Sequence, residues 1–179
     1  MTPADQTEGP TVALVGLMGV GKTSVGRRLS KALNLPFHDA DEEIERAAGR
    51  AVAEIFDELG EAAFRAGEHR VIARLIGGPR HVLATGGGAF VHPETRQLLK
   101  AQAVTIWLKC DLEVLARRVA RRDTRPLLRG KDPMEVLIAQ SQRRYPLYAE
   151  ADIVIETGEG SHQTAVDAIV SALAARGWQ

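Results

Sequence analysis

The stretch Gly-Leu-Met-Gly-Val-Gly-Lys-Thr, from Gly16 to Thr23, has the residue types and the spacing of a phosphate-binding loop. Its glycines can adopt backbone conformations closed to other residues, so that successive N–H groups can turn towards phosphate oxygens. Lys22 can reach the β- and γ-phosphates of a nucleotide, and the hydroxyl of Thr23 can bind Mg²⁺. This pattern indicates phosphoryl transfer, but it does not identify the acceptor.

Two carboxylates follow the second predicted strand, in the sequence Phe-His-Asp-Ala-Asp that ends at Asp41. In an extended chain, Asp39 and Asp41 would point to the same side. One could then hold a metal-bound water molecule while the other meets an acceptor hydroxyl. Alternatively, Asp41 caps the helical segment that begins at residue 42.

Arg65 and Glu68 are three residues apart, on one face of a predicted helix. Taken alone, this spacing is most simply a surface ion pair. The run from Gly86 to Gly88 is harder to explain by structure alone. Three glycines cost backbone entropy and are useful where the backbone must approach a ligand closely, so we expect this run to bind a ligand.

Arginines gather in two places, although the chain has no net charge. The first group comprises Arg117, Arg118, Arg121, Arg122, Arg125 and Arg129. Because Pro126 marks a loop, this group predicts a lid that closes over phosphates, rather than a solvated helix face or an RNA-binding patch. Arg143 and Arg144 form the second group. Two separate groups suggest two anions, the nucleotide and an acceptor with its own negative charge.

Short apolar segments alternate with longer segments of helical periodicity, which is typical of a parallel sheet covered by helices. The predicted strands are 11–15, 36–40, 81–85, 104–108 and 153–155. The predicted helices are 23–33, 44–48, 52–59, 61–75, 112–122, 133–144 and 164–176. The fold class is therefore α/β, a P-loop NTPase-type three-layer fold with a central parallel sheet of about five strands.

The composition limits where the protein acts and what it binds. The chain has 179 residues, a usual length for one domain, and 23 basic side chains balance 23 acidic ones. We therefore expect no binding to nucleic acid or to a membrane surface. No segment approaches the roughly 18 uninterrupted apolar residues of a membrane span. Residues 1–10 are expected to be a flexible lead-in, and the single cysteine, Cys110, suits the cytoplasm. We expect a monomer, since no long apolar surface stripe remains once the helices are docked.

The chain resembles shikimate kinases over nearly its whole length, from about Val12 to the last predicted helix. Five ordered motifs carry the resemblance. They are the loop 16–23, Asp39-Ala40-Asp41 followed by Ile44-Glu45, Phe64-Arg65 with Glu68, the run 86–88, and Arg125-Pro126-Leu127-Leu128 with Arg144 shortly before Pro146-Leu147-Tyr148.

The resemblance implies transfer of the γ-phosphoryl group of ATP to the 3-hydroxyl of shikimate, with Mg²⁺ required. This reaction is a step of chorismate and aromatic amino-acid synthesis. The resemblance also implies one kinase domain over residues 1–179, with a shikimate-binding region at 42–75 and a lid at 118–131.

By the same resemblance, Asp41 would hydrogen-bond the acceptor hydroxyls and act as the base. Lys22 and Arg125 would be the other catalytic residues. The residues that contact shikimate would be Asp41, Arg65, Gly86, Gly87, Gly88 and Arg144. The residues that contact ATP would be Gly19, Val20, Gly21, Lys22, Thr23, Ser24, Arg118 and Arg125. Thr23 would bind the metal, and Asp39 would reach it through water.

Thr85-Gly86 ends the third predicted strand, where many nucleotide-binding folds carry an acidic residue. Metal binding would therefore depend mainly on Thr23, nucleotide oxygens and water. The nearest alternatives are a kinase of the same fold that acts on gluconate or on a nucleoside monophosphate. Arg65 and Arg144, with the glycine run, favour a compact carboxylate over a nucleotide. Another alternative is a regulatory module that senses an aromatic acid, but we expect no room here for its DNA-binding segment.

Overall fold

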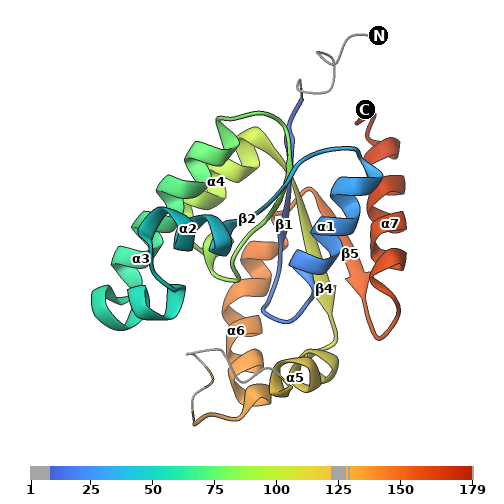
Figure 1. Ribbon diagram of the computed structural model, residues 1–179. Helices are drawn as coiled ribbons and strands as arrows, with labels where there is room; N and C mark the ends of the chain where they lie inside the picture. Colours follow the sequence, from blue (N-terminus) through green and yellow to red (C-terminus); the bar gives the residue numbers. More distant parts are fainter. Residues whose placement is uncertain (1–8, 122–127, 129, 179) are drawn as a thin grey trace.

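The computed structural model describes residues 9–121, 128 and 130–178 of the chain. Within these residues, five strands form one parallel sheet (Figure 1). They are β1 (Thr11–Val15), β2 (Phe37–Asp39), β3 (Val82–Ala84), β4 (Ala103–Cys110) and β5 (Ile153–Thr157). Their order in the sheet is β2-β3-β1-β4-β5, so the predicted α/β fold is confirmed.

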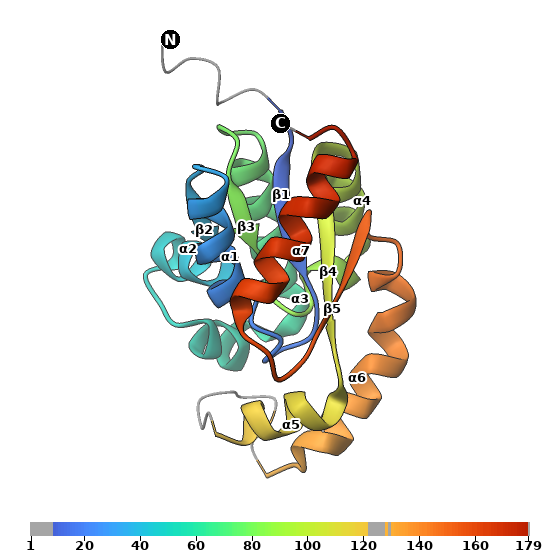
Figure 2. The ribbon, with the colours of Figure 1, turned by 90° about the vertical axis from the view of Figure 1, so that its right-hand side faces the viewer.

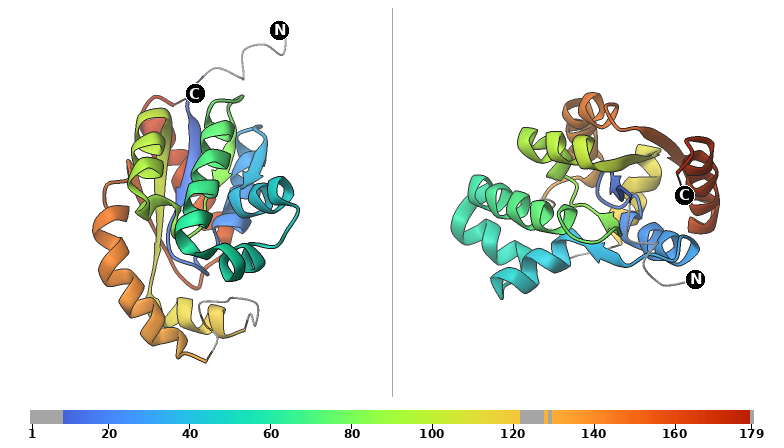
Figure 3. Two further views of the ribbon diagram at one scale, coloured as in Figure 1. Left: turned by 90° about the vertical axis from the view of Figure 1, so that its left-hand side faces the viewer. Right: turned by 90° about the horizontal axis from the view of Figure 1, so that it is seen from above.

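Helices cover both faces of the sheet and give the fold three layers (Figure 2, Figure 3). On one face, α1 (Lys22–Ala32) packs against α7 (His162–Ala175). On the other face lie α4 (Pro93–Gln102), α6 (Pro133–Tyr148) and the later part of α3 (Val52–Ile76). The other helical segments are α2 (Ala40–Ala48), the 3₁₀ turn η2 (Ala89–Val91) and α5 (Leu112–Ala120). None of the described helices combines the length and apolar content needed to cross a membrane.

The central strand, β1, is buried along all five of its residues. Its neighbours are β3, where Val12 pairs with Val82, and β4, where Val12 pairs with Val104. Because the strands are parallel, their carboxyl ends meet at one edge of the sheet. From β1 the chain crosses to β2 on one side and later returns to β4 on the other. Open α/β sheets bind ligands at such a point, beyond the carboxyl ends of the strands.

A small helical region formed by α2 and the first part of α3 lies beside β2 (Figure 1). Gly60 interrupts α3 with a non-helical backbone (φ 81°, ψ 172°), as expected from the two helices predicted there. The region has its own apolar cluster, made by Ile44, Ile55 and Phe64. Val71 contacts both this cluster and the main core, so the helical region is packed onto the sheet through α3.

α6 continues past Arg144, the predicted end of the helix, to Tyr148. Pro146 lies inside this extension, although proline removes one helical hydrogen bond. The tyrosines at positions 145 and 148 pack against Trp107 of β4, with ring centroids 5.0 and 5.8 Å away. This aromatic burial explains why the helix persists beyond the proline.

α4 is absent from the sequence-based predictions, although its start carries recognisable signals. Pro93 occupies the first turn, where its missing N–H costs nothing, and Glu94 lies in the same turn. Leu99 of this helix is fully buried against the sheet. α4 therefore packs on β4 and also contacts η2, the turn that follows the glycine run.

Candidate active site

The loop between β1 and α1 has the backbone that its glycines predict. Gly16, Gly19 and Gly21 all have positive φ, at 147°, 78° and 97°. A Cβ at Gly16 would lie 2.6 Å from the carbonyl oxygen of Leu108, so any side chain there would collide with β4. The loop is therefore pressed against the sheet, and its shape depends on glycine at these positions.

Lys22 starts α1 and is almost fully buried, at 9% exposure. Its ammonium group donates hydrogen bonds to the carbonyl oxygens of Gly16 at 2.7 Å and Leu17 at 3.0 Å. These bonds hold a positive charge at the loop, where α1 also presents its N-terminal end. Both features favour an anion such as a phosphate group.

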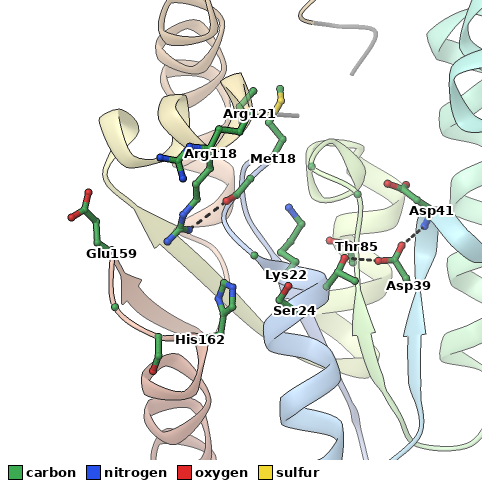
Figure 4. A pocket seen from close by; sticks show the side chains of 18 residues that line it. Met18, Lys22, Ser24, Asp39, Asp41, Thr85, Arg118, Arg121, Glu159 and His162 are labelled. Atoms are coloured by element: carbon green, nitrogen blue, oxygen red, sulfur yellow. Dashed lines mark hydrogen bonds between the residues drawn. The ribbon is translucent and has the colours of Figure 1, made fainter. Parts of the chain in front are cut away.

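A cavity of about 610 Å³ opens over this loop (Figure 4). Lys22 lies in its middle, with Arg118, Glu159 and His162 on one side and the two aspartates, Asp39 and Asp41, on the other. Gly19, Gly21, Thr23 and Ser24 also line it. Val20 does not line the cavity, because its side chain is buried in the core. This residue could therefore contact a ligand only through its backbone.

Asp39, rather than Asp41, caps α2. Its Oδ1 accepts hydrogen bonds from the N–H groups of Asp41 at 3.0 Å and Glu42 at 3.4 Å. The interpretation of Asp41 as the cap is therefore wrong, because α2 begins at Ala40 and places Asp41 in the first turn. The two carboxylates share the large cavity although they do not lie along one extended strand.

A second cavity, of about 170 Å³, adjoins the helical region formed by α2 and α3. Its charged side chains are Asp41, Arg65, Glu68 and Arg144, and its apolar side chains are Met18, Val52, Phe56 and Phe64. Gly86, Gly87 and Gly88 complete the lining. The cavity thus combines two guanidinium groups, a glycine backbone and an aromatic wall, which suits a small anion with an apolar ring face.

The guanidinium groups lie directly against the glycine run. A Cβ at Gly88 would be 2.0 Å from a side-chain nitrogen of Arg65, and one at Gly87 would be 3.2 Å from Nη1 of Arg144. Any larger residue at Gly88 would displace Arg65. Glycine is therefore needed here because two cations approach the backbone from different helices.

Glu68 is part of this site, although its spacing from Arg65, taken alone, suggested a surface ion pair. The pair is real, at 2.7 Å, but Glu68 is 1% exposed. Burial raises the pKa of the Glu68 carboxyl, Arg65 offsets part of this effect, and the negative charge of Asp41 adds to it. The other carboxylate oxygen, Oε2, is buried with no hydrogen-bond partner among the described residues.

Four residues line both cavities, namely Met18, Asp41, Gly86 and Gly87. Asp41 is the only ionisable group among these four. A carboxylate therefore lies at the junction between the space above the phosphate-binding loop and the space beside Arg65 and Arg144. This is where a general base would meet both a phosphoryl group and an acceptor hydroxyl.

The predicted lid is described only in part. Arg118 of α5 lines the large cavity and donates a hydrogen bond of 2.6 Å to the carbonyl oxygen of Gly158. Arg121 also lines this cavity, whereas Arg117 pairs with Glu159. Arg125, predicted to contact ATP, lies outside the described residues.

The segment from Glu159 to His162, which leads from β5 into the first residue of α7, lines the large cavity but is absent from the predicted site residues. It follows β5, so the rule that ligands lie at the carboxyl ends of parallel strands could have identified it. Glycines at 158 and 160 mark it as a connection rather than part of a helix. His162 lies close to the phosphate-binding loop, since a Cβ at Gly21 would be 2.9 Å from its ring.

Comparison with known proteins gives the same family from sequence and structure. A family model for shikimate kinase matches residues 18–174. A shikimate kinase of Caulobacter vibrioides is 64% identical over 163 residues, which are 91% of this chain and 82% of that protein. A shikimate kinase of Paramagnetospirillum magneticum is 50% identical over 165 residues, which are 92% of this chain and 85% of that protein.

Among solved structures, a shikimate kinase from Acinetobacter baumannii in complex with shikimate has a TM-score of 0.92 and 36% identity, covering 97% of each chain. A gluconokinase from Sinorhizobium meliloti has a TM-score of 0.63 at 18% identity, covering 92% of this chain and 91% of that one. This second likeness shows a common fold and nothing more. The family model and the 64% identity cover most of the chain, which therefore belongs to the shikimate kinase family.

Proposed function

We propose that the chain transfers the γ-phosphoryl group of ATP to the 3-hydroxyl of shikimate, giving shikimate 3-phosphate and ADP. Its relatives carry the name of this activity. The observation that supports it best is the position of Asp41, which lines both cavities. A carboxylate at that junction can serve an acceptor hydroxyl beside a bound triphosphate.

ATP would occupy the large cavity. The N–H groups of the loop and the start of α1 would bind the phosphates, and Lys22 would neutralise charge on the phosphoryl group in transfer. Arg118 and His162 lie away from the aspartates (Figure 4), where the nucleoside would be placed. Arg125 would approach the phosphates when the lid, residues 118–131, closes.

Shikimate would occupy the smaller cavity, within the proposed acceptor region 42–75. Arg65 and Arg144 would bind its carboxylate, and backbone groups of Gly86 to Gly88 would contact the ring substituents. Asp41 would accept the proton of the 3-hydroxyl as that oxygen forms a bond to the γ-phosphorus. The bond from that phosphorus to the β–γ bridging oxygen breaks at the same time, and ADP leaves with the electron pair.

The oxygens near the loop fit Mg²⁺. This ion prefers oxygen ligands and usually keeps several water molecules. The hydroxyl of Thr23 and the carboxylate of Asp39, whose oxygens are 2.6 Å apart, would hold it, Asp39 through water. No group of three or more His, Cys, Asp or Glu ligands occurs in the described part of the chain. When bound, the ion would neutralise charge on the β- and γ-phosphates.

A coupled assay of ADP release tests this proposal, with shikimate, gluconate and AMP as the three acceptors. We expect turnover that depends on shikimate and is far slower with the other two. Turnover with gluconate or with AMP, but not with shikimate, would assign another kinase activity. Tight binding of shikimate and ATP without turnover would favour a sensing module instead.

Three further expectations accompany this proposal. The protein would act in the cytoplasm, as a monomer, and without nucleic acid or a membrane as partner. The balanced charge of the chain supports the absence of a polyanionic partner. Analytical ultracentrifugation of the purified protein would test the monomer.

A further inference from the structure

Tyr148, in the last turn of α6, is fully buried and lies behind the glycine run. Its hydroxyl donates a hydrogen bond to the carbonyl oxygen of Gly87. Gly87 is one of the residues that line both cavities. The hydroxyl of a buried tyrosine is therefore hydrogen-bonded to the backbone of the site.

The same hydroxyl also interacts with Arg144, which precedes it by one helical turn. Burial raises the pKa of Tyr148 to about 12, and a hydrogen bond and charge from Arg144 offset part of that rise. The phenol therefore stays protonated at neutral pH and keeps its proton for the carbonyl oxygen of Gly87. The Tyr148 hydroxyl thus interacts with both Gly87 and Arg144, and the Arg144 guanidinium lies close to Gly87 as well.

The ring of Tyr148 is held by other aromatic rings. Phe90, in the turn that follows the glycine run, has its ring centroid 6.4 Å away, and Trp107 of β4 has its centroid 5.8 Å away. These contacts account for an aromatic ring at this position, and phenylalanine would satisfy them equally well. The hydroxyl needs a separate explanation.

We propose that Tyr148 is a positioning residue for the acceptor: its hydroxyl orients the peptide group between Gly87 and Gly88 and holds Arg144 beside it. A trans peptide is planar, so the bond to the Gly87 oxygen also directs the N–H of Gly88 away from α6. Gly88 and Arg144, which both line the smaller cavity, thus depend on one hydroxyl. The inference rests on the proposed function and deepens its account of acceptor binding.

Tyr148→Phe tests this, because it removes only the hydroxyl. We expect the KM for shikimate to rise about 5- to 15-fold, as for one lost hydrogen bond, with the KM for ATP changed less than about twofold. Tyr145→Phe is the matched control. That ring also packs on Trp107, at 5.0 Å, but its hydroxyl does not bond the glycine run. We expect both KM values of the control to stay within about twofold of the unsubstituted protein.

Thermal unfolding with each ligand gives a second measurement that separates positioning from stability. We expect shikimate to raise the Tm of Tyr148→Phe less than that of the unsubstituted protein, while ATP raises both equally. An unchanged KM for shikimate, or equal losses for shikimate and ATP, would overturn the inference. Failure of the unsubstituted protein to phosphorylate shikimate would instead overturn the proposed function.

Discussion

Thr23 and Asp39 join the start of α1 to the end of β2, through a hydrogen bond of 2.6 Å from the threonine hydroxyl to Oδ2 of the aspartate. The other carboxylate oxygen, Oδ1, accepts the N–H of Asp41 at 3.0 Å. One carboxylate therefore links the helix of the phosphate-binding loop to the helix that carries Asp41. The distance between the phosphate-binding loop and Asp41 therefore depends on the Asp39 carboxylate.

Asp39→Asn should weaken the response to Mg²⁺. The amide oxygen can still cap α2, so the free energy of unfolding should fall by no more than about 1 kcal/mol. The negative charge beside Thr23 is lost, so half-maximal activity should need a several-fold higher Mg²⁺ concentration. A titration of initial rate against Mg²⁺ at fixed ATP measures this shift. Asp111→Asn is the control, because Asp111 caps α5 in the same way. Identical titrations for both variants would contradict a role of Asp39 at the metal.

Asp41→Asn should lower kcat by about 10²- to 10⁴-fold, the usual contribution of a general base. ATP binding should stay nearly intact, because the phosphate-binding loop and Lys22 are unchanged. Calorimetric titration with a non-hydrolysable ATP analogue would measure the second effect. Glu42→Gln is the control, because Glu42 is exposed and pairs with Arg27. Near-normal kcat in Asp41→Asn would remove Asp41 from the role of base.

Lys22→Ala should lower kcat by about 10²- to 10³-fold, because positive charge at the phosphoryl group is lost in the transition state. The substitution also removes the two hydrogen bonds from Lys22 to carbonyl oxygens of the loop. Some loss of ATP affinity should therefore accompany the fall in kcat. Single-turnover kinetics with saturating ATP would separate the two effects. Lys31→Ala is the control, because Lys31 is exposed on the same helix. We expect it to leave kcat and ATP affinity unchanged. If saturating ATP restored full kcat to Lys22→Ala, the lysine would serve binding alone.

The phosphate-binding loop and the sheet could be predicted because they depend on local signals. Gly16 and Gly21 stand where positive φ is needed, and the apolar strands alternate with helices. Asp39 as the cap of α2 was less predictable, because it depends on whether a helix begins at Ala40 or two residues later. Helix ends shift readily by such a distance, since either aspartate could cap the first turn of a helix that begins directly after it.

The convergence of Arg65 and Arg144 on one cavity could not be derived from spacing. They lie on α3 and α6, and the packing of both helices on the same face of the sheet brings them together. The resemblance to shikimate kinases supplied this pairing. The burial of Glu68 is a similar case, since an i, i+3 pair has the same sequence pattern whether it faces water or a cavity.

Glu68→Gln should change how stability depends on pH. Burial raises the pKa of this carboxyl in the folded protein above its usual value of 4.5. As pH rises from about 4.5, the unfolded chain therefore loses this proton first, and the free energy of unfolding falls until the folded carboxyl is ionised too. Glutamine carries no such proton, so this part of the decline should disappear in the variant.

Urea unfolding of both proteins between about pH 4 and pH 8 would measure this difference. The stability of the unsubstituted protein relative to Glu68→Gln should be greatest near pH 4 and should decrease as pH rises. Glu61→Gln is the matched control, because Glu61 also faces Arg65, at 3.8 Å, but its side chain is 70% exposed. We expect the pH dependence of that variant to match the unsubstituted protein. The opposite result would be a Glu68→Gln variant that is most destabilised, relative to the unsubstituted protein, at high pH. Arg65 would then stabilise the ionised carboxylate more than burial destabilises it, and the pKa of Glu68 would be lowered rather than raised.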